Sequence, residues 1–121
     1  MQNSTFARIL EQVVAAIPGA RGAIFVDWEG EAVDAFSRLS YTGIRLVGAH
    51  WGVVYNQLKL AMQRLRLGAP VELVLRFARE QVIIRRVTDD YLALVTLESG
   101  ADFGRALAVM RWAEALLREE M

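Results

Sequence analysis

Cysteine is absent from this chain of 121 residues, and histidine occurs only once. Without cysteine there is no disulfide framework, no thiolate nucleophile and no cysteine-ligated zinc. The single histidine, His50, has no second histidine to share a metal, and a Ser-His-Asp triad would have to be built around it alone. The sequence therefore implies no cofactor and no metal.

An excess of charge of either sign is also missing, because 14 Lys and Arg face 14 Asp and Glu. A zero net charge argues against a nucleic-acid partner held by phosphate neutralisation. No stretch approaches about 18 uncharged apolar residues, which predicts no membrane insertion. The polar start, MQNSTFARILEQ, lacks the pattern of a signal peptide. We therefore expect a cytoplasmic protein, and the length favours a single domain over residues 1–121.

Hydrophobic spacing predicts a helix at each end of the chain. The first follows a cap at Asn3, Ser4 or Thr5 and is ended by Pro18 and Gly19. Its apolar stripe, at period 3.6, consists of Phe6, Ile9, Leu10, Val13, Val14 and Ile17. The last begins after Asp102, and its stripe consists of Phe103, Ala106, Leu107, Met110, Ala113, Leu116 and Leu117.

Between these helices the pattern predicts a hairpin, a long helix and three strands. Strands over 21–28 and 31–37 are joined by Glu29 and Gly30, and short links join the later strands. The long helix is predicted over 44–67 and the strands over 71–78, 81–87 and 91–98. The predicted order is α-β-β-α-β-β-β-α. Its economical packing is an α/β (α+β) fold in which one five-stranded antiparallel sheet carries three helices on its faces.

The helix over 44–67 is apolar on two sides. One stripe has the spacing of a core face and consists of Val47, Trp51, Val54, Leu58, Ala61 and Leu65. A second stripe lies about 130° away and consists of Leu46, Ala49, Val53, Leu60 and Leu67. Positions 46, 53, 60 and 67 are seven apart, the spacing of a helix–helix seam. The second stripe therefore predicts a homodimer interface, unless the first or last helix covers it. Gly48 and Gly52 indicate close approach of another backbone at a helix crossing.

The strand over 71–78 is a candidate edge strand, because it follows the long helix directly. Unprotected edges invite pairing with another chain, so two copies can join there while their long helices pack together. Glu72, Val74 and Arg76 share one face of this strand. The two charges can pair with their antiparallel counterparts across a two-fold axis. The alternative is an exposed face with two ordinary charges.

We find no catalytic or nucleotide-binding motif: GxxxxGK[ST], GxGxxG and HExxH are all missing. The carboxylates of the first hairpin and the Asp89-Asp90 pair fit solvated turns. His50 fits packing or a hydrogen bond at an interface. The sequence therefore does not indicate an enzyme.

The stretch from Ile17 to Gly30, IPGARGAIFVDWEG, is followed by a long glycine-containing helix, three strands and a last helix. In this order the chain resembles the Roadblock family, which includes a class of dynein light chain and bacterial gliding-motility regulators of Ras-like GTPases. The resemblance implies a profilin-like α/β/α domain and homodimers built through the second helix and third strand. It also implies a non-enzymatic regulator or adaptor that binds a small Ras-like GTPase and modulates its nucleotide cycle. A structural scaffold or light-chain-like subunit is the alternative.

Overall fold

In the computed structural model, which describes residues 4–121, three helices and five strands follow one another in the predicted order. They are α1 (Thr5–Ala16), β1 (Ala20–Asp27), β2 (Ala32–Ser37), α2 (Tyr41–Gln63), β3 (Glu72–Arg76), β4 (Glu80–Thr88), β5 (Tyr91–Glu98) and α3 (Phe103–Glu119). The strands form one antiparallel sheet in the order β2-β1-β5-β4-β3. The predicted antiparallel sheet and the edge position of the third strand are confirmed.

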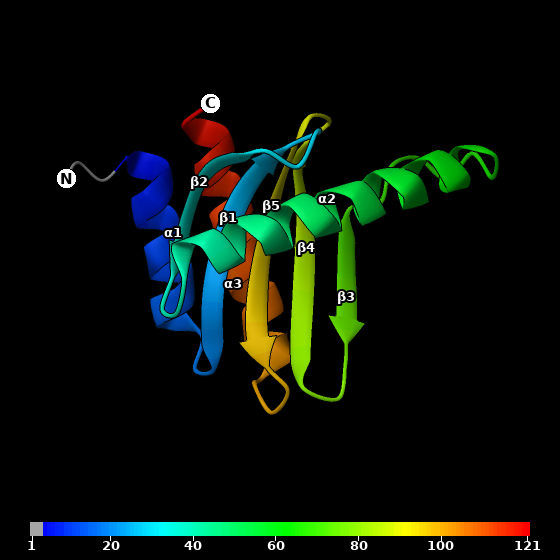
Figure 1. Cartoon of the computed structure of the whole chain (residues 1–121). Coiled ribbons are helices and arrows are strands. Elements are labelled where there is room, and N and C mark those ends of the chain that lie inside the picture. The colour runs from blue at the N-terminus through cyan, green and yellow to red at the C-terminus, as the bar shows by residue number, and fades with distance from the viewer. Residues whose placement is uncertain (1–3) are drawn as a thin grey trace.

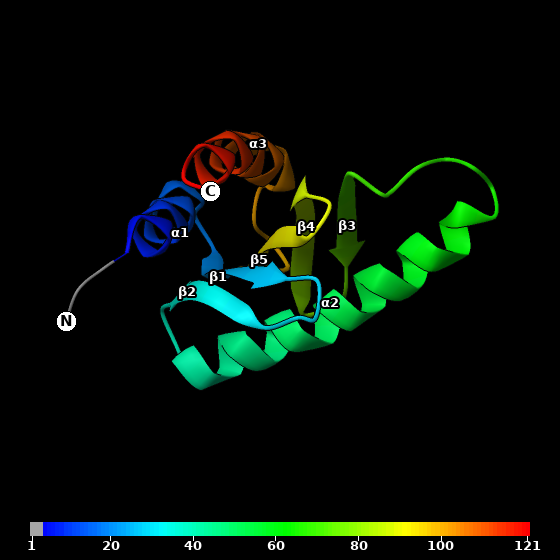
Figure 2. The same ribbon diagram turned by 90° about the horizontal axis from the view of Figure 1, so that it is seen from above.

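The sheet lies between two helical layers (Figures 1 and 2). Helices α1 and α3 lie side by side on one face, and α2 crosses the other face alone. The α1–α3 layer covers the larger core, in which Leu10, Phe25, Val95, Met110 and Leu117 are almost completely buried. Within the described residues no helix is long and apolar enough to cross a membrane.

Helices α1 and α3 form where the sequence predicts them, because each has a capping side chain and one apolar stripe. The Ser4 hydroxyl accepts a hydrogen bond from the Ala7 amide, and the Asp102 carboxylate accepts one from the Arg105 amide. The other predicted cap, Asn3, lies outside the described residues. Both helices bury residues of their predicted stripes, which are Ile9, Leu10, Val13 and Val14 in α1 and Ala106, Met110, Ala113 and Leu117 in α3.

The turn between β1 and β2 is built by Asp27. One of its carboxylate oxygens accepts hydrogen bonds from the amides of Glu29 and Glu31, at 2.9 and 3.0 Å. Gly30 takes a φ of 84°, which other residues rarely adopt. Aspartate is a poor strand former, but Asp27 is favourable at the end of β1 because its side chain accepts the hydrogen bonds that hold the turn.

Helix α2 is displaced toward the N-terminus relative to the predicted range of 44–67. It begins at Tyr41 because the Ser40 hydroxyl accepts a hydrogen bond from the Gly43 amide. It ends at Gln63, after which Arg66 and Gly68 take positive φ values of 56° and 83° and turn the chain toward β3.

The face that α2 buries is also rotated from the predicted core stripe. The buried residues are Ile44, Gly48, Gly52 and Tyr55, whereas Val47, Trp51, Val54 and Leu58 are only half-buried, and Ala61 and Leu65 are exposed. The last turns of α2 extend beyond β3 and have no sheet beneath them (Figure 2). The predicted stripe is therefore wrong for this end of the helix.

The two glycines explain the rotation. A Cβ atom at Gly48 would lie 2.8 Å from the Ile24 side chain, and one at Gly52 would lie 2.9 Å from the Cα of Gly30. The glycines therefore let α2 approach the sheet and the β1–β2 turn closely. The predicted helix crossing at these glycines is wrong, because their neighbour is the sheet and not another helix. Because this face is the one that docks, the opposite side of α2 points to solvent.

Candidate interaction surface

The second predicted stripe is exposed along its length, and its last member, Leu67, lies in the turn after α2 rather than on the helix. The exposed fractions are 67% for Leu46, 52% for Val53, 62% for Leu60 and 70% for Leu67, and Ala49 is exposed as well. Helices α1 and α3 lie on the opposite face of the sheet and cannot cover it (Figure 2). Within residues 4–121 the intramolecular alternative is therefore excluded. We call these five residues the outer stripe.

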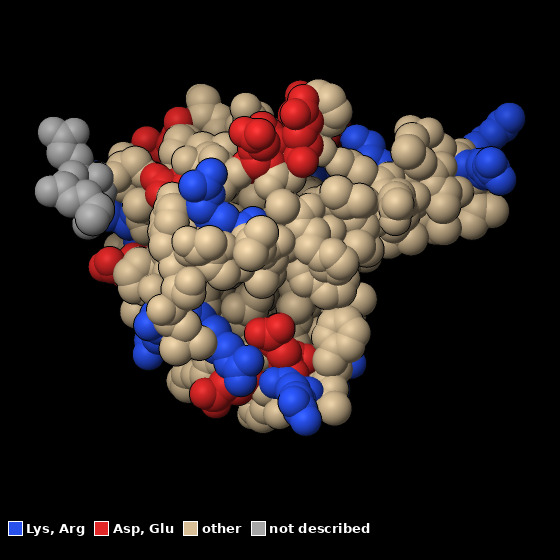
Figure 3. All heavy atoms as spheres, in the orientation of Figure 1, with Lys and Arg blue, Asp and Glu red and all other residues tan. Residues whose placement is uncertain are grey.

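The face that carries α2 is largely uncharged (Figure 3). Acidic side chains gather at the end where the β1–β2 and β4–β5 turns lie, and basic side chains mark the far tip of α2. An apolar surface bounded by charged ends is typical of a protein–protein contact, since large exposed apolar patches are uncommon on monomers.

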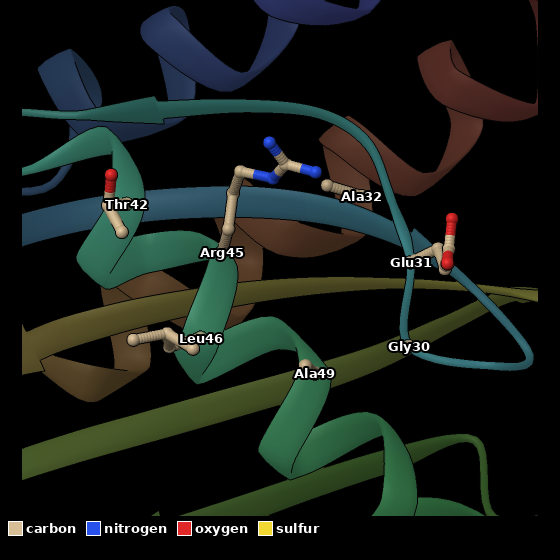
Figure 4. Close-up of a pocket in the computed structure, with 7 residues that line it drawn as sticks. All are labelled: Gly30, Glu31, Ala32, Thr42, Arg45, Leu46 and Ala49. Atoms are coloured by element: carbon tan, nitrogen blue, oxygen red, sulfur yellow. The ribbon is translucent and has the colours of Figure 1, made fainter.

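A hollow of about 350 Å³ adjoins the outer stripe at the N-terminal half of α2. Its walls come from the β1–β2 turn and from α2, and its lining residues are Gly30, Glu31, Ala32, Thr42, Arg45, Leu46 and Ala49. The Arg45 side chain reaches from α2 toward Ala32, while the Glu31 carboxylate stays apart from it (Figure 4). Leu46 and Ala49 belong to both the hollow and the outer stripe, so the two features form one continuous surface.

The backbone of β3 presents a free edge. The Arg86 amide donates to the Val71 carbonyl at 3.0 Å, and the Phe77 amide donates to the Glu80 carbonyl at 2.8 Å. In an antiparallel ladder the inward direction alternates, so the intervening even-numbered residues point their N–H and C=O groups away from β4. These residues are Glu72, Val74 and Arg76, and within the described chain no other strand pairs with them.

The side chains of Glu72 and Arg76 already have partners inside the subunit. One carboxylate oxygen of Glu72 accepts a hydrogen bond from the Arg85 guanidinium at 3.0 Å. The other lies 3.8 Å from a guanidinium nitrogen of Arg111 in α3. Arg76 lies over the ring of Phe103 at 4.9 Å, a cation–π geometry. The charges therefore lie on the α3 side of the sheet, where they tie the edge strand to that helix.

A chain of ion pairs extends from Glu72 along α3. Arg85, whose side chain is 16% exposed, also donates to Glu114 at 2.6 Å, and Glu114 pairs with Arg118. The Arg118 guanidinium in turn donates to the Val87 carbonyl at 3.0 Å. Sequence reasoning missed this network, because its members are spread over 46 positions, from Glu72 to Arg118, and share no motif.

A second polar cluster anchors α2 to the loop before β3. The Tyr55 hydroxyl donates to the Pro70 carbonyl at 2.6 Å, and burial raises the pKa of Tyr55 above its usual value. Arg86 and Asp89 pair nearby, and their hydrogen bond lowers the pKa of the Asp89 carboxyl and raises that of Arg86. This cluster is structural, since it fixes the connection between the outer stripe and the β3 edge.

The other polar and aromatic side chains on the surface do not converge on a site. His50 is exposed and lies edge-on to Trp51 at 4.9 Å, and Trp28 in the hairpin turn is 57% exposed. Within residues 4–121 no group of three or more His, Asp and Glu side chains is placed to hold a metal ion. The feature that stands out in this part of the chain is the surface formed by the outer stripe and the β3 edge.

Solved structures share this architecture over almost the whole chain. The Roadblock/LC7 domain from Streptomyces avermitilis matches with a TM-score of 0.86 and 14% identity, over 93% of this chain and 94% of that one. The chain has the Roadblock fold. MglC from Myxococcus xanthus matches this Roadblock fold with a TM-score of 0.71 and 25% identity, over 98% and 100% of the two chains.

A structure described as MglB with tetrameric arrangement matches the Roadblock fold of this chain with a TM-score of 0.86 and 14% identity, over 98% and 92%. A profilin from Acanthamoeba castellanii has the same layers at a TM-score of 0.56 and 16% identity, over 93% and 92%. These likenesses support a relationship to the Roadblock family and confirm the profilin-like fold. No family model and no curated protein sequence matches the chain.

Proposed function

We propose that the protein is a non-enzymatic homodimer that binds a small Ras-like GTPase and modulates its nucleotide cycle. The observation that carries the dimer is the outer stripe, with four large apolar residues seven apart and more than half exposed. The GTPase partner follows from the sequence resemblance to the Roadblock family and is supported by the structural likeness to MglB and MglC.

The outer stripe fits an antiparallel pair of α2 helices. A two-fold axis between Asn56 and Gln57 places Val53 opposite Leu60 of the partner subunit. It also brings Leu46 to the end of the partner's α2, next to the turn that carries Leu67. The hollow beside Leu46 then receives the end of the partner's helix. Burying each large apolar side chain contributes about 1.5–3 kcal/mol, so four per subunit are enough to offset the cost of association.

The β3 edge suits the same two-fold arrangement better than the β2 edge does. Strand β2 is interrupted by a bulge at Val33 and carries Asp34 next to it, devices that discourage pairing with another chain. Strand β3 has an unbroken register. Pairing centred on Val74 places Glu72 opposite Arg76 of the partner subunit, so the charges are self-complementary.

The dimer is tested by placing a charge in the outer stripe. Val53→Glu or Leu60→Glu should give a folded monomer, because two carboxylates would be buried near the axis without partners. Light scattering measures the mass, and circular dichroism checks the fold. Gln12→Glu, at an exposed position on α1, is the control and should remain dimeric. A dimer that survives both stripe substitutions would contradict this interface.

Regulation requires that the dimer bind one nucleotide state of the GTPase better than the other, because only differential binding shifts an equilibrium. A pull-down from the native host, with GDP and with a non-hydrolysable GTP analogue, should recover a P-loop GTPase in one nucleotide state preferentially. Recovery that is independent of nucleotide would instead favour a scaffold, the alternative that the sequence leaves open.

A further inference from the structure

Helix α3 carries a second regular line of residues on the side that faces away from its core. The line has the alternating spacing of three and four that is typical of helix–helix contacts. At 100° per residue its members fall within about 80° of arc. All of them are exposed, and they are Arg105, Ala108, Trp112, Ala115 and Glu119. We call these five residues the α3 stripe.

The middle of the α3 stripe has the features of a protein contact. Trp112 is 45% exposed, and exposed tryptophans are common anchors of interfaces. A hollow of about 370 Å³ lies beside it on the α1–α3 layer, opposite α2 (Figure 2). Its lining residues are Gln12, Ala16, Arg105, Ala108, Val109 and Trp112. Arg105 is the only charged residue of this lining.

The two charges of the α3 stripe select a second copy of this chain. Arg105 and Glu119 are each seven residues from Trp112. An antiparallel pair of α3 helices with a two-fold axis at Trp112 therefore places Arg105 opposite Glu119 of the partner subunit, and does so twice. A parallel pair would place like charges together, which disfavours it. Within residues 4–121 neither charge has an ion-pair partner, although the Arg105 Nε donates to the Ala16 carbonyl at 2.6 Å.

The same axis sets small apolar side chains against larger ones. Ala108 lies opposite Leu116 of the partner subunit, and Val109 lies opposite Ala115 of the partner subunit. Leu116 and Val109 are only half-buried within their own subunit, so each has apolar surface left to bury. Facing small and large residues interdigitate, and the alanines allow the two helix axes to approach to about 8 Å.

The charges around the α3 stripe do not oppose this contact. Glu114 is half-buried and pairs with Arg85 and Arg118 inside the subunit. The other exposed charges on or next to α1 and α3 are three of each sign: Arg8, Arg111 and Arg118, and Glu11, Asp102 and Glu120. A face without net charge does not repel a copy of itself.

We propose that two copies of this chain bind each other through antiparallel α3 stripes. The contact uses neither α2 nor β3, so it does not rest on the proposed dimer. The stripe is about 21 Å long, and a contact built on one pair of helices belongs to the small, transient class of interfaces, below about 1,200 Å². We therefore expect it at about 100 µM or above. In dilute solution Val53→Glu and Leu60→Glu are still the monomers described above.

The Val53→Glu variant isolates the α3 contact, because it removes the proposed α2 contact. Sedimentation equilibrium between about 10 µM and 1 mM should show its mass rising from one chain to two. Val53→Glu/Trp112→Glu should stay at one chain throughout. Val53→Glu/Trp28→Glu is the matched control, since Trp28 is 57% exposed in the β1–β2 turn, and it should associate as Val53→Glu does.

A Val53→Glu variant that stays at one chain at the highest concentration would overturn the α3 contact. If Val53→Glu is a pair even when dilute, the outer stripe is wrong. The α3 contact then stands only if adding Trp112→Glu dissociates that pair, and it is overturned if the pair remains.

Exchanging the two charges tests the antiparallel register. In the Val53→Glu background, Arg105→Glu or Glu119→Arg should weaken self-association by at least about tenfold, because each places like charges opposite one another twice. An equal mixture of the two variants should recover the parent's affinity, since both contacts of a mixed pair join opposite charges. The variant that carries both exchanges should recover it too, which controls for the lost bond to Ala16. If neither sample recovers, the register is wrong and the proposal with it.

Discussion

Tyr55 connects α2, which carries most of the outer stripe, to the loop before β3 through one hydroxyl group. It lies on the buried side of α2, and its hydrogen bond to the Pro70 carbonyl holds the loop that leads into β3. Burial disfavours the phenolate and raises the pKa of Tyr55, with the nearby Arg86 acting in the opposite direction. The unfolded chain keeps the usual value near 10. This residue therefore stabilises the fold below that pH, and its contribution is lost as the pH rises toward and through the folded-state pKa.

Tyr55→Phe is predicted to lower the free energy of unfolding by about 1–2 kcal/mol at neutral pH, because the carbonyl of the half-buried Pro70 loses its donor. The variant should also lose less stability than the wild type when the pH is raised above about 10. Urea denaturation at neutral and alkaline pH measures both effects. Tyr41→Phe, at an exposed tyrosine, is the control for removing a hydroxyl. An alkaline decline of wild-type size in Tyr55→Phe would show that another group causes it.

At the scale of the element, β3 is an edge strand whose two sides have different roles. The amides of Leu73 and Leu75 point toward β4, whereas the Val74 amide points away from the sheet. A proline at an outward position removes no hydrogen bond within the subunit, and edge strands tolerate it for this reason. The same proline removes a bond that a paired partner strand would need.

Val74→Pro is therefore predicted to abolish the dimer while the subunit stays folded. Leu75→Pro is the matched comparison, because its inward amide is part of the ladder, and it should lose about 3 kcal/mol or more of stability. Sedimentation gives the oligomeric state and thermal denaturation gives the stability. If Val74→Pro remains a dimer, the β3 edge is not part of the interface.

The helices show what hydrophobic spacing can and cannot predict. In α1 and α3 one stripe faces one core, so residues such as Leu10 and Met110 were correctly assigned. In α2 the outer stripe was also recognised, but the docking face was not. Gly48 and Gly52 carry no hydrophobic signal, although their lack of a side chain is what lets the helix approach the sheet. A docking face made partly of glycine therefore cannot be predicted from the spacing of large apolar residues.

At the scale of the whole molecule, charge is distributed unevenly although the sum is zero. Acidic side chains gather at the end of the molecule where the β1–β2 and β4–β5 turns lie, and basic side chains mark the far tip of α2 (Figure 3). The composition predicts the sum but not this separation. It also does not predict the ion pairs of Glu72, Arg85 and Glu114, because these residues meet only after the sheet has formed. The order of elements and the apolar seam were predictable from local spacing, whereas the contacts that bind α3 to the edge strand were not.

The irregularity at Val33 has a consequence for growth of the assembly. Two subunits joined through β3 would leave only their β2 strands at the outer margins, and each of these is kinked where one residue has no counterpart on β1. A third copy has no straight strand to align with. In such a pair, strand addition would therefore stop at two subunits, which would keep the protein from polymerising into a fibre.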